Sequence, residues 1–153
     1  LLARKIGAVK GAGFAKLIVE MQRMVSQAKK IDGLAYLAEK LEAAVKRLEE
    51  ITAGIVKKAV SMEFKTAFAH SLPLLHVMGD VIMGWMLLWR AVVASEKLNG
   101  KCKKKDKAFY KGEIKTAEFF IRTELIITMG KMEAIEEGCS AAIDIDNDGF
   151  GSL

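Results

Sequence analysis

Residues 66–95 decide the fold of this chain, and they read TAFAHSLPLLHVMGDVIMGWMLLWRAVVAS. Their only formal charges are Asp80 and Arg90, so a helix built from them is apolar around most of its circumference. A membrane-spanning helix needs about 20 nearly uncharged apolar residues, whereas His70, His76 and Asp80 interrupt the first half of this stretch. We therefore expect no transmembrane segment here, but the central helix of a domain, buried among other helices.

Pro73 lies near the start of this central helix and is the only proline of the chain. Proline has no backbone N–H to donate, and it restricts the residue before it, here Leu72. The helix must therefore begin near Ser71 or kink there. We expect a kink, preceded by a first helical section.

Two amphipathic helices precede the central one. Apolar residues recur at spacings of three and four over residues 14–31, and again over residues 34–55. Asp32 and Gly33 between the two stripes are a turn signal. Because the connection is short, the two helices are expected to form an antiparallel hairpin.

A fourth helix follows the central one. Asn99 and Gly100 tolerate left-handed dihedral angles and should end the central helix. A loop over residues 101–107 contains five lysines, and Asp106 in it is placed to cap the next helix. The apolar stripe of that fourth helix runs without interruption from residue 114 to residue 135.

These segments predict an all-α fold, an up-and-down helical bundle of four principal long helices with a short C-terminal tail. No segment shows sustained period-two alternation, so no sheet is expected. The length of 153 residues suits one domain. We expect a linker over residues 1–12, the bundle over residues 13–138 and an acidic tail over residues 139–153.

Charge and cysteine content narrow the function classes. The net charge of +5 is too small for a dedicated nucleic-acid binder. Cys102 and Cys139 form no C-x-x-C pair, so we expect free thiols in a reducing cytoplasm, and no signal peptide opens the chain. Because the first residue is Leu1 and not Met, we expect the chain to have lost its start or to have been cut from a longer protein.

Histidine and carboxylate patterns offer little catalytic chemistry. A di-metal site in a bundle needs Glu-x-x-His motifs, and neither His70 nor His76 has a carboxylate three positions before it. His76 and Asp80 are spaced i, i+4, so a carboxylate could orient an imidazole for proton transfer or ligation. The favoured interpretation is a polar pair beside the core or at a contact surface. No catalytic and no cofactor-binding residue is predicted.

The C-terminal tail resembles half of a calcium loop. Asp144, Asp146 and Asp148 alternate before Gly149, as in the D-x-D-x-D-G pattern. The chain ends at Leu153, two residues before the bidentate glutamate of such a loop. A solvated acidic tail is therefore favoured, and the three aspartates are only weak candidates for a metal site.

Two tryptophans mark the central helix as a candidate interaction surface. Trp85 and Trp89 are four positions apart, so they lie on neighbouring parts of one helix face. Buried tryptophans commonly anchor interfaces, but both could equally fill the bundle. With His76 and Asp80, they make up the predicted contact surface.

Several short segments of the chain together carry a resemblance to a known family. They are Ser71-Leu72-Pro73-Leu74-Leu75, Gly79, Gly84-Trp85-Met86-Leu87, Arg90-Ala91, Phe109-Tyr110-Lys111 and Thr116-Ala117-Glu118-Phe119-Phe120. With them, the chain resembles the C-terminal helical extension of a subgroup of bacterial acyl-CoA dehydrogenases. The opening residues 1–6, Leu-Leu-Ala-Arg-Lys-Ile, are similar to the Leu-x-Arg-Lys-Leu element that links the flavin-binding body of those enzymes to the extension.

The resemblance implies a parent enzyme that holds FAD and oxidises acyl-CoA to enoyl-CoA. In the family the catalytic glutamate belongs to a Tyr-Glu-Gly-Thr segment before the linking element, and this chain has no such segment. The chain alone is therefore expected to be inactive and to hold no FAD. Its expected role is docking onto the upstream dehydrogenase body and contact within a homo-oligomer.

Two alternatives of other classes remain. The chain could be a freestanding helical-bundle adaptor or self-association module without an enzyme parent. It could also be a small calcium-responsive module built on residues 144–148.

Overall fold

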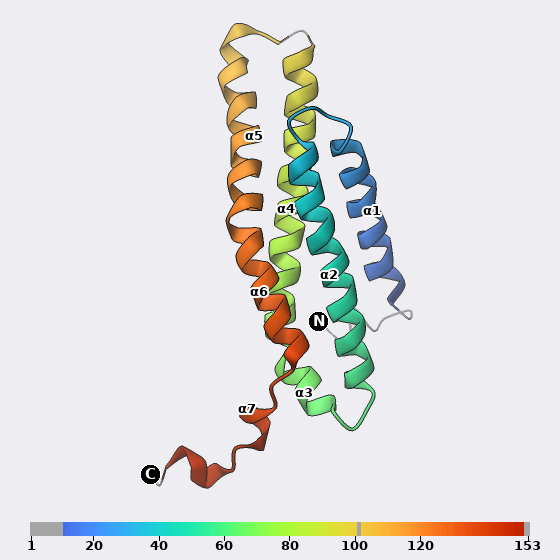
Figure 1. Cartoon of the computed structure of the whole chain (residues 1–153), viewed down its shortest axis with the longest axis vertical. Coiled ribbons are helices and arrows are strands. Elements are labelled where there is room, and N and C mark those ends of the chain that lie inside the picture. The colour runs from blue at the N-terminus through green and yellow to red at the C-terminus, as the bar shows by residue number, and fades with distance from the viewer. Residues whose placement is uncertain (1–10, 101, 152–153) are drawn as a thin grey trace.

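The computed structural model describes residues 11–100 and 102–151 and has an all-α architecture (Figure 1). Its long helices run up, down, up and down, which confirms the predicted bundle. The residues described in the expected linker are Gly11 and Ala12, and the rest of it lies outside the described residues. The helices are α1 (Ala12–Ala28), α2 (Ala35–Ala59), α3 (Phe64–Ala69), α4 (Ser71–Asn99), α5 (Lys107–Arg122), α6 (Glu124–Glu137) and α7 (Ala141–Asp144).

The hairpin of α1 and α2 forms as predicted. Gly33 adopts a φ of 82°, a left-handed conformation that glycine enters without steric cost. The turn places Leu34 at 1% exposure, so the connection itself contributes to the core. The apolar stripes of both helices are buried, with Met21 of α1 and Leu48 of α2 fully enclosed.

The predicted bend near Pro73 is present, but it is a complete break that lies before the proline. The short helix α3 ends at Ala69, His70 separates it from α4, and α4 begins at Ser71. Pro73 is thus the third residue of α4, where a backbone N–H has no intrahelical acceptor in any case. The expectation of a kink within one helix was wrong because the first turn of a new helix accommodates proline without loss.

The connection from α4 to α5 differs from the expectation in two details. Gly100 ends α4 in an extended conformation, with φ of −97° and ψ of −153°, instead of a left-handed one. Asp106 occupies the residue before α5 but forms no side-chain capping hydrogen bond. The reason is local: a 3₁₀ turn over Lys104–Asp106 leads directly into α5, so Asp106 already has helical dihedral angles.

The predicted fourth helix is divided into α5 and α6 at Thr123. The Thr123 hydroxyl donates to the Phe119 carbonyl at 2.7 Å, a side-chain bond that competes with the helical ladder. The apolar stripe nevertheless continues across the break, because the residues spaced three and four apart stay on the core side. Those buried residues are Ala117, Ile121, Leu125, Thr128, Met132 and Ile135.

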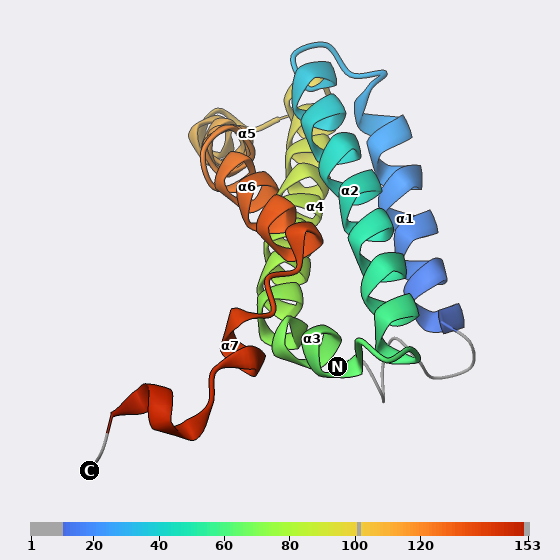
Figure 2. The same cartoon turned by 60° about the horizontal axis from the view of Figure 1, so that its bottom comes forward.

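Helix α4 is central to the bundle, as predicted. It contacts α1, α2, α5 and α6, and Figures 1 and 2 show it between the α1–α2 hairpin and the α5–α6 column. Gly84 marks its closest approach to its neighbours: a Cβ there would lie 3.3 Å from Leu41 of α2 and 3.8 Å from Leu125 of α6. The glycine therefore lets three helices meet at one level.

Helix α4 also has the length and apolar composition of a membrane span. In the bundle, 50% of its most apolar 18-residue window is buried. One such helix is weak evidence for a span, since the core helix of a soluble protein meets the same criteria. Its packing against four other helices explains its apolar composition.

The chain after α6 leaves the bundle. Gly138 has a φ of 68° and ends α6 in the left-handed conformation that commonly terminates helices. The short helix α7 contacts α3, and a 3₁₀ turn over Asn147–Phe150 follows. Figure 2 shows this tail projecting away from the long helices.

The two glycines of α4 provide a matched test of this packing. We expect Gly84→Leu to lower the free energy of unfolding by about 1–3 kcal/mol, because the added side chain overpacks a filled site. Gly79 is exposed, and a Cβ there meets nothing within 4 Å. Gly79→Leu should therefore raise the free energy of unfolding by up to about 1 kcal/mol through helix propensity. Urea denaturation followed by circular dichroism at low protein concentration measures both, and equal effects would contradict the assigned core.

Candidate functional site

One side of α4 is apolar and exposed. Its members recur at helical spacings, and each exposes 41–58% of its surface. The expected burial among other helices therefore holds for only part of the circumference of α4, and this side is exposed. We call this surface the α4 strip; it consists of Leu72, Leu75, Met83, Met86, Trp89 and Val93.

Few polar groups interrupt the α4 strip. His76 and Gly79 lie on the same side of the helix and are exposed. Arg90 also lies there, and its guanidinium forms an ion pair of 2.5 Å with Glu113 of α5. The Glu113 side chain is only 14% exposed, so this charge pair is held against the bundle and the strip carries little net charge.

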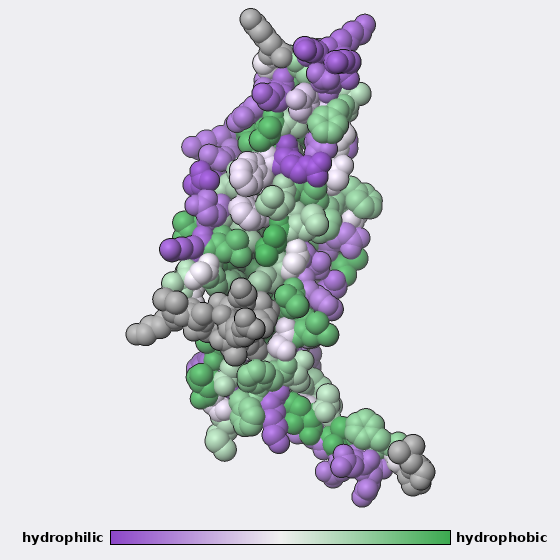
Figure 3. Space-filling model, turned by 180° about the vertical axis from the view of Figure 1, so that it is seen from behind, coloured by the Kyte–Doolittle hydropathy of each residue, from purple (hydrophilic) through white to green (hydrophobic). Residues whose placement is uncertain are grey.

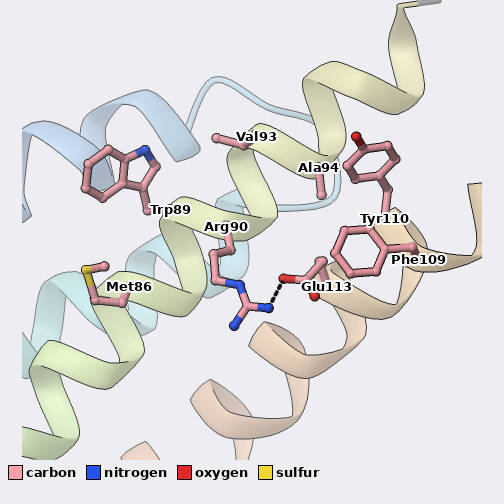
Figure 4. Close-up of a pocket in the computed structure, with 8 residues that line it drawn as sticks. All are labelled: Met86, Trp89, Arg90, Val93, Ala94, Phe109, Tyr110 and Glu113. Atoms are coloured by element: carbon pink, nitrogen blue, oxygen red, sulfur yellow. Dashed lines mark ion pairs between the residues drawn. The ribbon is translucent and has the colours of Figure 1, made fainter. Parts of the chain in front are cut away.

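A groove of about 490 Å³ opens beside the upper part of the strip, between α4 and α5. Figure 4 shows Met86 and Trp89 of α4 on one side of the Arg90–Glu113 pair and Phe109 and Tyr110 of α5 on the other. Such a volume and apolar character are typical of concave binding sites. Its lining residues are Met86, Trp89, Arg90, Val93, Ala94, Phe109, Tyr110 and Glu113.

The two tryptophans have different environments. Their rings stack with centroids 6.0 Å apart and an interplanar angle of 27°. Trp85 is half-buried and packs against the core, with its indole nitrogen enclosed, whereas Trp89 is 41% exposed in the groove. Trp85 therefore packs as part of the bundle, whereas Trp89 is part of the exposed α4 strip.

His76 and Asp80 lie in different environments on α4. His76 is exposed on the strip side, whereas the Asp80 carboxylate turns to α6. There Asp80 accepts a hydrogen bond from the Thr128 hydroxyl at 2.9 Å and forms an ion pair with the Lys131 ammonium at 3.1 Å. The Asp80 carboxylate thus links α4 to α6 through these two contacts. Of the two residues predicted as a polar pair, Asp80 links α4 to α6, and His76 takes no part in that link.

The tail aspartates are not gathered into a metal site. Within residues 11–100 and 102–151, no group of three or more His, Cys, Asp or Glu side chains is arranged to hold an ion. Asp144 instead accepts a hydrogen bond from the Ser140 hydroxyl. His70 is also engaged here, with its Nε2 3.3 Å from the Cys139 carbonyl oxygen. Metal binding by Asp144, Asp146 and Asp148 stays a prediction.

A second apolar surface lies at the end of the bundle where α1 begins, α2 ends and α4 begins (Figure 1). Met62 is 97% exposed there and Val60 85% exposed, both in the connection from α2 to α3. The Ser61 hydroxyl shapes this connection by donating to the Lys58 carbonyl and accepting from the Glu63 amide. We call this surface the end patch; it consists of Val60, Met62, Phe64 and Phe68.

The sequence analysis named Trp89 and His76 on this side of α4 but not the rest of the α4 strip, and it did not name the end patch. The signal for the end patch was present, since its apolar residues lie outside the two helical stripes that precede the central helix. The signal for the α4 strip was that residues 66–95 contain more apolar residues than one buried helix face requires. Figure 3 shows apolar side chains over this side of the molecule and its α3 end, with hydrophilic residues gathered at the opposite end.

Ion pairs elsewhere join α2 to α6 and lie along the surface of α5. Hydrogen bonding to Glu136 of α6, aided by Glu50, raises the pKa of Arg47. Hydrogen bonds from Lys115 and Arg122 lower the pKa of Glu118. The stabilisation from Glu118 is therefore present above the unfolded pKa of that group and is lost as the pH falls through its folded pKa. Because Glu118 is solvated, this contribution is small.

Comparison with known proteins identifies the family. The family model described as Acetyl-CoA dehydrogenase C-terminal like matches residues 17–146, which include α2 to α6 and most of α1. The match spans most of the bundle that carries the α4 strip and the end patch. The chain therefore belongs to this family of C-terminal domains.

A curated relative agrees with this assignment. The broad-specificity linear acyl-CoA dehydrogenase FadE5 of Mycobacterium tuberculosis (strain ATCC 25618 / H37Rv) is 31% identical over 72 residues. These residues make up 47% of this chain and 12% of that protein. The similarity thus covers a small part of the longer dehydrogenase.

The link between Asp80 and Thr128 can be measured by a double-mutant cycle. We expect Asp80→Ala and Thr128→Val to be coupled by about 0.5–1.5 kcal/mol, the net value of one hydrogen bond between part-buried groups. Urea unfolding of both single variants and the double variant gives the coupling. As a matched control, the cycle of Asp80→Ala with Thr116→Val should show none, because Thr116 bonds the Gly112 carbonyl instead. Additive effects at Asp80 and Thr128 would contradict the link.

Proposed function

We propose that this chain is the C-terminal helical domain of an FAD-dependent acyl-CoA dehydrogenase and serves docking instead of chemistry. The full enzyme would oxidise acyl-CoA to enoyl-CoA, with the catalytic base and the flavin site in the body upstream of residue 1. The family match and the partial similarity to an acyl-CoA dehydrogenase support this proposal. A cytoplasmic location follows from the same proposal.

The single observation that carries the docking role is the end patch. Met62 is almost fully exposed, and Phe64 and Phe68 are about half exposed, at one end of the bundle. Helix α1 begins at that same end, so a body that precedes the domain would lie close to the patch. An exposed cluster of large apolar side chains is typical of a contact surface.

Burial of the end patch gives the docking its driving force. Full burial of a large exposed apolar side chain contributes about 1.5–3 kcal/mol. Val60 and Met62 can gain most of this on contact, and Phe64 and Phe68, which are already half-buried, can gain about half of it. The tie between Ser61 and its neighbours already shapes that connection, which reduces the entropy lost on contact.

Hydrogen exchange tests the docking directly. We expect the amides of residues 60–68 to be more protected in the full-length dehydrogenase than in the 153-residue chain, because the body covers the end patch. The matched control is the α2–α6 surface around Ile126, whose exposure is similar to that of Phe64 and Phe68. Equal exchange of residues 60–68 in both proteins would contradict docking through this end.

Flavin content tests the assignment of chemistry. We expect the purified 153-residue chain to be colourless and inactive on acyl-CoA, because the cofactor and its protein environment would belong to the body. The visible absorption spectrum and a dye-reduction assay with acyl-CoA measure this. Stoichiometric flavin in the isolated chain would overturn the proposal.

The sequence upstream of residue 1 separates this proposal from the alternative of a freestanding adaptor. A reading frame that continues upstream into a dehydrogenase body with a Tyr-Glu-Gly-Thr segment is the expected result. A frame that starts near residue 1 would favour a self-association module without an enzyme parent.

A further inference from the structure

The α4 strip shares no residue with the end patch, and the docking proposal leaves it without a partner. It runs from Leu72 to Val93, which at 1.5 Å per residue is about 32 Å along the helix. A surface of that length exceeds what a small ligand in the α4–α5 groove would cover. Its length suits a helix laid along it.

We propose that the α4 strip binds the α4 strip of a second copy of this chain, antiparallel, about a two-fold axis near residues 82 and 83. This pairing goes beyond the proposed docking onto a dehydrogenase body, because it uses a different surface. Two copies related by a two-fold axis present the same patch to each other, so the patch must be self-complementary. Charge and shape both meet that requirement.

The charge of the strip favours a like partner. Between Leu72 and Val93 the formal charges are Asp80 and Arg90. Asp80 is paired with Lys131 of α6, and Arg90 is paired with Glu113 of α5. Because both charges are compensated within the same molecule, two strips can meet without like-charge repulsion. A strongly acidic or basic partner gains nothing from this surface.

The shape of the strip fixes the register. Gly79 is exposed, and the space above it is open, so it forms a gap in the row of side chains. Met86 lies seven residues further, which is about two helical turns, and it is 41% exposed. In an antiparallel pair centred between residues 82 and 83, Met86 of each copy enters the gap at Gly79 of the other.

The same register places the remaining members of the strip, with Leu75 falling opposite Arg90, whose guanidinium is paired with Glu113. Leu72 of one copy lies opposite Val93 of the other, and His76 lies opposite Trp89. Met83, 51% exposed, lies next to the axis and contacts its counterpart. Methionine and tryptophan are enriched in protein interfaces, and flexible methionine side chains adapt to a symmetric contact.

Sedimentation velocity tests the association. We expect the 153-residue chain to show a concentration-dependent monomer–dimer equilibrium, and Met86→Lys to weaken it at least about tenfold. The matched control is Ile126→Lys, which changes a residue of comparable exposure on the α2–α6 side and should leave the equilibrium unchanged. Circular dichroism checks that both variants remain helical.

Disulfide trapping tests the register. In a chain with Cys102→Ser and Cys139→Ser, we expect Met83→Cys to form a covalent dimer on mild oxidation. Mixing chains that carry Gly79→Cys with chains that carry Met86→Cys should give the mixed dimer, whereas Ile126→Cys should give none.

Three results would overturn the proposal. The first is a chain that stays monomeric at every concentration. The second is a dimer insensitive to Met86→Lys or cross-linked through residue 126. The third is a monomeric chain that binds neutral phosphatidylcholine vesicles through the strip, since a lipid surface would then be its occupant. None of these bears on the end patch, so the docking proposal stands or fails separately.

Discussion

The packing of the other helices around α4 is the constraint on which the rest of this structure depends. Helices α1, α2, α5 and α6 all pack against α4, and its apolar side chains, such as Leu74 and Leu88, are enclosed between them. A helix with so few charges must remove most of its surface from water to be stable in a soluble domain. Gly84 allows the close approach that this requires.

The bundle covers only part of α4, and this partial coverage leads to the proposed contacts. Four neighbours enclose one side of the helix, while the side from Leu72 to Val93 remains in contact with solvent. The charges that flank the exposed side, Asp80 and Arg90, are compensated by α6 and α5. The result is a neutral apolar surface, separate from the end patch formed by the connection before α3.

Local sequence patterns predicted the main elements and missed their interruptions. The apolar stripes over residues 14–31 and 34–55 and the turn at Gly33 are confirmed. The break at Thr123 was not predicted, because the stripe continues across it and only the hydroxyl bond to Phe119 reveals it. The candidate site was predicted less well: Trp89 is exposed as a contact residue requires, but Asp80 is occupied between helices.

The sequence by itself determined the all-α bundle, the central position of α4 and the family resemblance, because helical periodicity and composition are local properties of the chain. Only the tertiary structure decided which side of α4 is exposed, since that depends on where α1, α2, α5 and α6 pack. It also decided that Asp80 meets Thr128 and Lys131 instead of His76. These contacts join residues about fifty positions apart, and helical spacing carries no information over such a separation.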